Sequence, residues 1–343
     1  MVSAAHSTTS SRATSSWGAT VRQAAQEHPS LFALVLAVVL FIANVARLPA
    51  FAGWSELPGE VGTLAPFALI AMASTPAILS GGAGIDLSVA PLMGLINVMF
   101  VVYLLPHGLG NPAIAIPLML LAGGIVGMLN GFMVAVLRFP PVIATLGTYF
   151  VLAGLGLDIA PDPVSASPNW TNQLATSIGH IPGAVFSIGG ALLFWYLIRR
   201  LPYHRALLAV GGGDAAAFSA GVNATLVRIV AYTIGGMVAG LAGLALTGTI
   251  QSADTTVWPA YVIVALAAVA LGGTALGGGR GGFVGSLLGA TCVFLIQNLI
   301  SVFGISVFYL QVAYGAVLLV AVVIGAQLSG TGRPAASLAG SSS

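Results

Sequence analysis

The chain has 343 residues, of which 58% are hydrophobic and only 5% are charged. Soluble domains carry about 25% charged residues, so this composition excludes an ordinary water-exposed domain and indicates a membrane protein. The net charge of +2 leaves no basic patch for nucleic acid, and because all ten basic residues are arginine, lysine-dependent chemistry such as a Schiff base or a P-loop is excluded too.

Ten apolar stretches approach the length of about 20 residues that a membrane helix needs. Gly and Pro interrupt several of them, which is tolerated where neighbouring helices satisfy the backbone. We therefore expect an all-α fold, a polytopic transmembrane bundle of about ten spans, or eight if one pair is re-entrant. The expected spans are 31–48, 62–80, 86–105, 112–137, 141–158, 181–198, 228–250, 259–276, 282–302 and 308–327.

The segments on either side of this transmembrane domain, which covers 29–328, are small and polar. Residues 1–28 are rich in Ser, Thr and Ala, and 329–343 are similar, so we expect both to be disordered. Residues 1–28 are too long and polar for a standard cleaved signal, which makes the first span an expected uncleaved anchor.

The arginines predict the orientation of the bundle. With ten spans and a cytoplasmic N-terminus, nine of the ten arginines fall inside and only Arg47 falls outside, as the positive-inside rule requires. Removing one span would scatter the later arginines over both sides. Both termini are therefore expected in the cytoplasm. The inside arginines are Arg12, Arg22, Arg138, Arg199, Arg200, Arg205, Arg228, Arg280 and Arg333.

Two connecting segments are long. The segment 158–180 is expected outside and contains no arginine, whereas 199–227 is expected inside and is rich in Ala and Gly over 206–221. Glycines also recur every four residues within three spans, which places them on one helix face. They indicate either tight helix packing or faces that slide during gating. They are Gly123, Gly127 and Gly131, then Gly236 and Gly240, then Gly285 and Gly289.

Polar side chains are rare within the expected spans. Asp86 follows a glycine-rich break, where its carboxylate can cap the next helix, line a pathway as part of a broken helix, or do both. Neutral polar residues can bind solute hydroxyls or bond between helices. The candidates for lining a pore are Asn97, Asn130, Thr145, Asn298 and Gln311. No chain of buried acids and bases accompanies them, which argues against a proton-coupled carrier.

The run 277–282 formally contains G-x-G-x-x-G, but it lies between apolar spans and has no acid within the next 60 residues. It is therefore interpreted as a tight cytoplasmic turn built on Gly278, Gly279, Arg280 and Gly281, not as a dinucleotide site. The chain also lacks H-E-x-x-H and G-x-S-x-G, and its histidines have no metal-ligand spacing. We expect no enzyme activity, no metal and no cofactor bound by this chain.

Four blocks in order resemble a known family, the membrane permeases of bacterial sugar-importing ABC transporters of the ribose, arabinose, xylose, galactose and autoinducer type. Residues 84–89 read G-I-D-L-S-V, a family signature that includes Gly84, Asp86 and Ser88. Residues 141–147 are similar to the family's P-F-I-x-T-L-G. Residues 209–217 resemble its A-x-G-G-N-E-x-A-A, and 267–285 its A-A-V-x-L-G-G-T block with G-G-R-G. Together the blocks cover roughly 60–325.

The resemblance implies a permease subunit in the inner membrane that pairs with a second permease, identical or different. Two cytoplasmic ATP-binding domains would use ATP and Mg, and a periplasmic or lipid-anchored binding protein would deliver the solute. The family's ATPase-coupling segment matches the stretch with Gly212, Asp214, Ala217 and Gly221, where a short helix is expected to begin near Asp214. The arginines independently place this segment inside.

The chain departs from the family pattern at several positions, including Gly213 and Asp214, where the family has Asn and Glu. Substrate identity therefore stays open. The alternatives are a permease for branched-chain amino acids or nucleosides in the related ABC branch, a secondary carrier or channel, and a membrane scaffold without flux.

Overall fold

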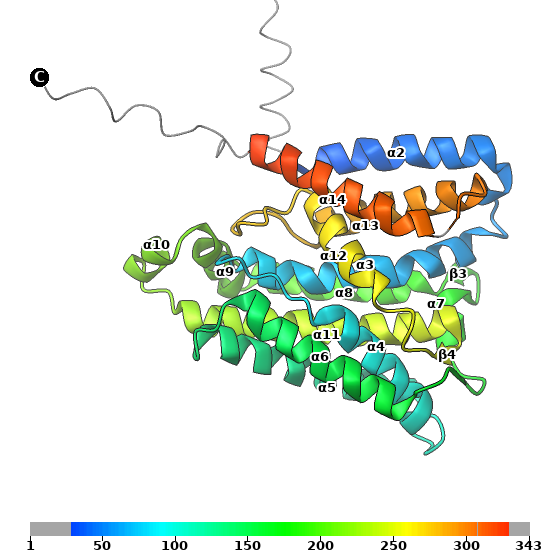
Figure 1. Cartoon of the computed structure of the whole chain (residues 1–343), viewed down its shortest axis with the longest axis horizontal. Coiled ribbons are helices and arrows are strands. Elements are labelled where there is room, and N and C mark those ends of the chain that lie inside the picture. Colours follow the sequence, from blue (N-terminus) through cyan, green and yellow to red (C-terminus); the bar gives the residue numbers. More distant parts are fainter. Residues whose placement is uncertain (1–28, 307, 329–343) are drawn as a thin grey trace, which may run out of the picture.

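The computed structural model describes residues 29–306 and 308–328, so the expected disordered segments 1–28 and 329–343 lie outside the described residues. Long helices run along one axis of the molecule (Figure 1). The helices are α2 (Pro29–Arg47), η1 (Pro49–Ala52), α3 (Leu57–Leu79), α4 (Val89–Met99), the π-helical η2 (Phe100–Leu104), α5 (Pro112–Ala135), α6 (Pro141–Ile159), α7 (Thr171–Ala175), α8 (Ala184–Arg200), α9 (Pro202–Gly212), α10 (Asp214–Ser219), α11 (Ala224–Ile250), α12 (Ala260–Leu271), α13 (Phe283–Val302) and α14 (Phe308–Leu328).

Each expected span coincides with one of these helices. Six of them, α2, α3, α5, α6, α11 and α13, are long and apolar enough to cross a membrane, and the bent pair of α8 and α9 makes a seventh. The other three expected spans contain shorter apolar helices, namely Val89–Leu104, Ala260–Leu271 and Tyr309–Ala321. The all-α polytopic fold is therefore confirmed, whereas the count of ten spans stays a prediction.

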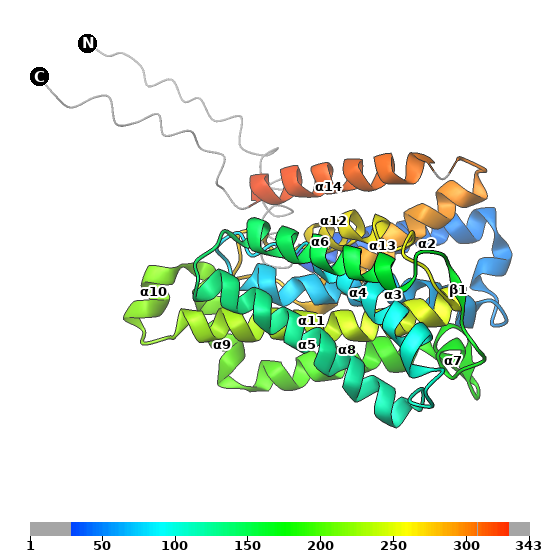
Figure 2. The ribbon, with the colours of Figure 1, turned by 60° about the horizontal axis from the view of Figure 1, so that its bottom comes forward.

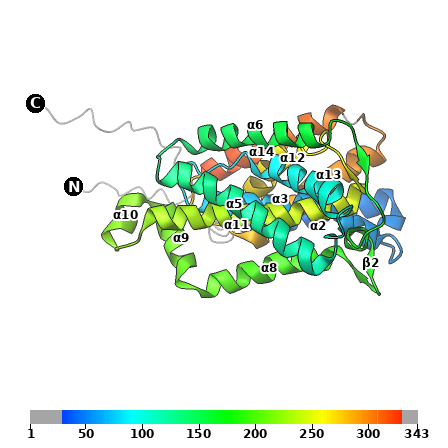
Figure 3. The same ribbon diagram turned by 90° about the horizontal axis from the view of Figure 1, so that it is seen from below.

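The helices α3 and α11 form the centre of the bundle. In their most apolar stretches 83% and 72% of residues are buried, against 17% for α2 and 22% for α6. Seen from below, α3 and α11 lie between α6 on one side and α8 on the other (Figure 3). A helix that is apolar on every face is stable only where other helices or lipid surround it, and α3 is enclosed by protein.

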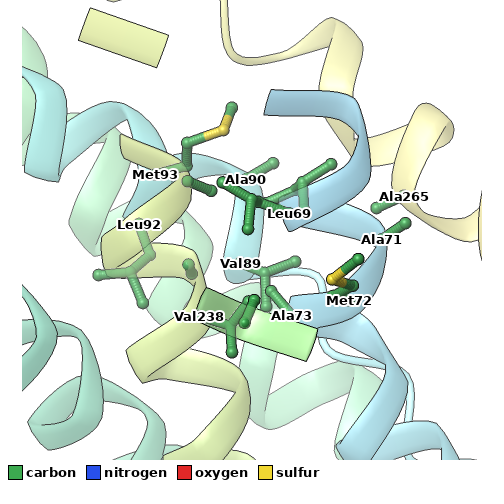
Figure 4. Packing of buried hydrophobic residues seen from close by; sticks show 14 of the residues in the cluster. Leu69, Ala71, Met72, Ala73, Val89, Ala90, Leu92, Met93, Val238 and Ala265 are labelled. Atoms are coloured by element: carbon green, nitrogen blue, oxygen red, sulfur yellow. The ribbon is translucent and has the colours of Figure 1, made fainter. Parts of the chain in front are cut away.

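The hydrophobic core lies where α3, α4, α11 and α12 meet. Figure 4 shows side chains from all four helices in this cluster, including Met72, Met93, Val238 and Ala265. The outer helices instead expose large apolar side chains, such as Ile143 at 65% and Phe150 at 64% on α6. Exposed apolar surface of this kind is what a lipid-facing helix presents.

The glycine stripes of α5 and α11 face each other. A Cβ atom on Gly123 would lie 2.2 Å from the carbonyl oxygen of Gly236, and one on Gly127 would lie 2.2 Å from that of Tyr232. In the same way Gly289 of α13 packs on the Ala268 carbonyl of α12, with 1.9 Å to its Cβ position. The tight-packing interpretation is confirmed, and sliding of these faces stays untested.

The long segments lie at opposite ends of the bundle (Figure 1). The segment 158–180 contains β1 (Val164–Ser165) and β2 (Ser177–Ile178). β1 pairs with β4 (Ser252–Ala253), and β2 pairs with β3 (Ile181–Pro182). The segment 199–227 contains the helix expected near Asp214, which is α10, and a second helix, α9, that was not expected from the sequence. The axis bends by 85° between α8 and α9. The Trp195 ring holds this bend by stacking on Phe283, with ring centroids 4.3 Å apart, and by contacting His204.

Candidate functional site: a glycine junction beside a short exposed helix

Three glycine-rich turns meet at the end of the bundle that carries α10. They are 80–84 between α3 and α4, 211–213 between α9 and α10, and 277–282 between α12 and α13. The Gly279 N–H donates a hydrogen bond to the Leu79 carbonyl oxygen over 3.1 Å. A Cβ on Gly211 would lie 1.9 Å from that same oxygen. We call Gly81, Gly211, Gly278 and Gly279 the glycine junction.

Glycine is required in the junction for two reasons. Gly81, Gly278 and Gly279 have φ angles of 73°, 96° and 75°, in the left-handed region that residues with a Cβ rarely adopt. The backbones also touch, because a Cβ on Gly278 would lie 2.5 Å from the Gly81 Cα. Three sequence blocks that are far apart in the chain are thereby joined without an intervening side chain.

The other residues of the predicted cytoplasmic turn support its shape. Gly281 packs so closely against Thr274 that a Cβ on Gly281 would lie 2.4 Å from the Thr274 hydroxyl oxygen. Arg280 has an exposed side chain, and its carbonyl accepts a hydrogen bond from Ala275 N–H at 2.9 Å. The run 277–282 is thus a turn between helices, as expected from the sequence.

The signature residues of the break between α3 and α4 form a buried polar network. Asp86 Oδ1 accepts hydrogen bonds from Ser88 N–H at 2.9 Å and Ser88 Oγ at 2.6 Å. The carboxylate therefore holds the turn before α4, and the predicted helix cap is wrong because Ser88 is the N-cap residue and no side chain caps the helix. Asn130 Nδ2 on α5 donates to Ser88 Oγ over 2.7 Å, and Thr148 Oγ1 on α6 donates to Asn130 Oδ1 over 2.5 Å. Gly84 lies in the same break, where a Cβ would be 2.3 Å from a carbonyl oxygen of α3.

Thr145 fastens α6 to the same break. Its hydroxyl accepts a hydrogen bond from Leu87 N–H at 3.2 Å and donates to the Pro141 carbonyl at 2.9 Å. The break is therefore held by α5 and α6 together, whereas a pathway lined by Asp86 stays a prediction.

The five candidate pore residues do not converge. Only Asn130 and Thr145 share the network at the break. Asn97 Nδ2 donates to Thr247 Oγ1 at 2.9 Å and to the Ser252 carbonyl at 2.8 Å, so it bonds between elements at the other end of α4. Asn298 Nδ2 lies 3.3 Å from a carboxylate oxygen of Glu60. Gln311 has an exposed side chain on α14.

The helix expected near Asp214 is present as α10. It begins at Asp214 and ends in a Schellman motif, in which Val222 N–H bonds to the Ala217 carbonyl at 3.0 Å. Gly221, with φ 74°, supplies the left-handed residue that this motif needs. Gly212 is the last residue of α9, just before α10, and has open space around its Cβ position.

The side chains of α10 divide between the bundle and solvent. Ala217 is 1% exposed, whereas Phe218 is 81% exposed. The helix α10 itself lies at one tip of the molecule (Figure 2). Asp214 Oδ1 does not cap its own helix; it pairs with Arg228 Nη2 of α11 at 2.6 Å. That salt bridge ties α10 to the central helix α11.

Sequence reasoning missed the roles of Phe218 and Arg228. A large apolar residue among Ala, Gly and Ser in an arginine-bounded segment was a usable signal for Phe218. The pairing of Arg228 with Asp214 had no local signal, because 14 positions and a turn separate them.

Nearby in α9, burial lowers the pKa of His204, and the Arg199 charge lowers it further.

Long apolar helices joined by short turns, with a short helix beside the bundle, define a polytopic membrane protein. The chain belongs to the family described as "Branched-chain amino acid transport system / permease component", whose model matches residues 61–326.

Its relatives are import permeases. The chain is 33% identical over 307 residues to the ribose import permease protein of Bacillus subtilis (strain 168), with 86% of this chain and 91% of that protein covered. It is 34% identical to the fructose import permease protein of Rhizobium meliloti, covering 75% and 73%. It is 31% identical to the D-allose transport system permease protein of Escherichia coli (strain K12), covering 76% and 80%. No solved structure gives a significant match. The resemblance to sugar-importing ABC permeases is thus confirmed.

Proposed function

We propose that this chain is the permease subunit of an ABC importer and forms the path for a monosaccharide or a similar polar solute. Separate subunits supply the ATPase activity with ATP and Mg, and this chain binds neither. The observation that carries the proposal is α10, a short helix with an 81% exposed phenylalanine, joined through backbone contacts to the break between α3 and α4. The family and its ribose, fructose and allose permeases support the class of solute.

The helix α10 is the surface on which the ATPase subunit docks. An aromatic side chain that is this exposed at the end of a membrane protein is costly in water and suits a hydrophobic groove on a partner. Ala217 packs inward and Gly221 ends the helix, so the orientation of Phe218 is set by the bundle.

The path of motion runs from α10 through the glycine junction to the break before α4. Gly211 follows any displacement of α10 because two residues separate it from Asp214, and it contacts Leu79 and Gly279 directly. From Leu79 the chain continues into the break that holds Asp86. Movement of the ATPase subunits is thereby passed to α4, α5 and α6 at the polar network.

The proposed orientation has both termini in the cytoplasm and ten spans in the bacterial inner membrane. Among the described residues, Arg138, Arg228 and Arg280 lie in or beside the turns at the end with α10, and Arg199, Arg200 and Arg205 lie in the α8–α9 bend there. Arg47 ends α2 at the opposite end, near β3 and β4 (Figure 1). This asymmetry supports a cytoplasmic position for α10.

The partners are a second permease subunit, identical or different, two cytoplasmic ATP-binding domains, and a periplasmic or lipid-anchored solute-binding protein. Asn130 and Thr145 are the candidate path residues that the proposal keeps, because they hold the break. The family description leaves branched-chain amino acids as the second candidate solute class.

Reconstitution with the ATPase and the binding protein tests the proposal. ATP-driven uptake of a labelled pentose or hexose is expected, and uptake that needs only a solute gradient and this chain would contradict it. Phe218→Ser is expected to abolish co-purification of the ATPase without loss of folding. Trp54→Ser removes an aromatic ring that is 88% exposed at the opposite end, and it should leave co-purification unchanged.

A further inference from the structure

A cavity of about 500 Å³ opens beside the glycine junction. Its walls come from the turn after α3, the end of α5 and its link to α6, the start of α10 and the first three turns of α11. The volume lies in the range of pockets that bind small molecules, about 300–1,000 Å³. The residues that carry the argument are Arg138, Phe139, Asp214, Arg228 and Tyr232.

The charge of the cavity is positive. Arg138 and Arg228 line it against a single acid, Asp214, which is already paired with Arg228. No described residue accepts a hydrogen bond from the Arg138 guanidinium. Arg138 also has φ 60°, a left-handed conformation that is costly for a residue with a long side chain and that turns the chain sharply between α5 and α6.

An unsatisfied buried hydroxyl in the wall points independently to a ligand. Tyr232 is 0% exposed, and among the described residues its Oη has no hydrogen-bond partner. A buried hydroxyl without a partner is destabilising, because the group has lost its water and gained nothing in return. Tyr232 and Arg228 both line the cavity, one turn apart on α11.

The mouth of the cavity is continuous with lipid-facing surface. Phe139 lines the cavity and is 48% exposed, and Leu137 and Ile143 beside it are 49% and 65% exposed. A ligand can therefore place an anionic group between the arginines while its apolar part lies along α5 and α6. Basic pockets between membrane helices at the cytoplasmic surface bind anionic headgroups in this way.

We propose that this cavity binds a phosphate group, carried by the headgroup of an anionic phospholipid of the cytoplasmic leaflet. Arg138 and Arg228 contact the phosphate oxygens, and the Tyr232 hydroxyl donates a hydrogen bond to one of them. The leaflet follows from the orientation proposed above, whereas the phosphate chemistry depends only on the residues of the cavity. A headgroup bound here contacts Arg228, the partner of Asp214. It therefore affects the salt bridge that attaches α10 to α11.

Native mass spectrometry of the full chain in detergent, titrated with phosphatidylglycerol, tests the proposal. The wild type is expected to retain the lipid, Arg138→Gln to bind it at least tenfold more weakly, and Tyr232→Phe about tenfold more weakly. Arg205→Gln is the matched control, because Arg205 is an exposed arginine at the same end that does not line the cavity. Equal retention by all four proteins would overturn the proposal.

Tyr232→Phe also separates binding from folding. It removes an unpartnered hydroxyl, so in vesicles of pure phosphatidylcholine it should unfold at the same temperature as the wild type or higher. In vesicles that contain phosphatidylglycerol the wild type should gain more thermal stability than this variant. Inorganic phosphate is the second probe. Stabilisation by phosphate without lipid retention would support the anion site and assign a soluble source, and stabilisation by neither probe would overturn the site.

Discussion

The contact between Gly211 and the end of α3 gives a sharp test of the glycine junction. In Gly211→Ala the new methyl carbon would lie 1.9 Å from the Leu79 carbonyl oxygen and 2.3 Å from Gly279 N, where contacts below 3.0 Å are essentially never seen. Both neighbours are backbone atoms, joined by their own 3.1 Å hydrogen bond, so neither can rotate away.

The magnitude follows from what has to move. Overpacking of a well-packed site costs about 1–3 kcal/mol, and loss of the hydrogen bond between Gly279 and Leu79 costs about 1 kcal/mol more. Alanine gains up to about 1 kcal/mol over glycine at the end of a helix. We therefore expect Gly211→Ala to lower the free energy of unfolding by about 1–4 kcal/mol.

The assay is denaturant unfolding of the purified chain, followed by ATP-driven uptake in the reconstituted importer. The matched control is Gly277→Ala, because Gly277 belongs to the third turn but has open space at its Cβ position and lacks a left-handed φ. The control should unfold within about 0.5 kcal/mol of the wild type. In Gly211→Ala uptake per ATP hydrolysed should fall. Equal unfolding free energies for the two variants would refute the steric reasoning.

Three further predictions concern other parts of the bundle. Asn130→Ala leaves the Ser88 hydroxyl without its donor in a buried site, so it should lower the unfolding free energy by about 2–3 kcal/mol in the same denaturant titration. Gly127→Ala should cost about 1–3 kcal/mol because its Cβ meets a carbonyl at 2.2 Å, whereas Gly147→Ala, with nothing within 4 Å, should be neutral. Burial and Arg199 lower the pKa of folded His204, so the unfolded chain binds its proton more readily, and thermal stability should fall as pH drops below about 6.5. His204→Phe should remove that part of the pH dependence, and an unchanged slope would exclude His204 as its source.

Composition and periodicity were sufficient to predict the helices and their order. The long apolar runs are a direct consequence of lipid as solvent, so every expected span corresponds to a helix in the structure. The four-residue spacing of Gly123, Gly127 and Gly131 likewise predicted one smooth helix face. The spacing does not identify the helix that packs against this face. That helix is α11, and three-dimensional packing selects it.

The candidate site was predictable only in part, because its contacts cross the whole chain. Asp86 and Ser88 are two residues apart, and the hydrogen-bonded turn they form is a local property of the sequence. Asn97 and Asn130 are the same residue type in similarly apolar helices, and nothing local distinguishes the residue of the network from the one that bonds near β4. Their roles differ only because α4 and α5 present them to different neighbours.

The same reasoning explains why the junction is built of glycine. A contact through long side chains would absorb a displacement by changes of rotamer, whereas a contact between backbones has no side-chain rotamer that can absorb it. The turn at Gly211 touches the turns before α4 and before α13 in this way. A force on α10 therefore has two outcomes: the three turns move as one body and carry the polar network of Asp86 with them, or the Gly279–Leu79 hydrogen bond breaks. An importer that is driven by separate ATPase subunits requires that the three turns move as one body. The lack of side chains at the junction favours this outcome.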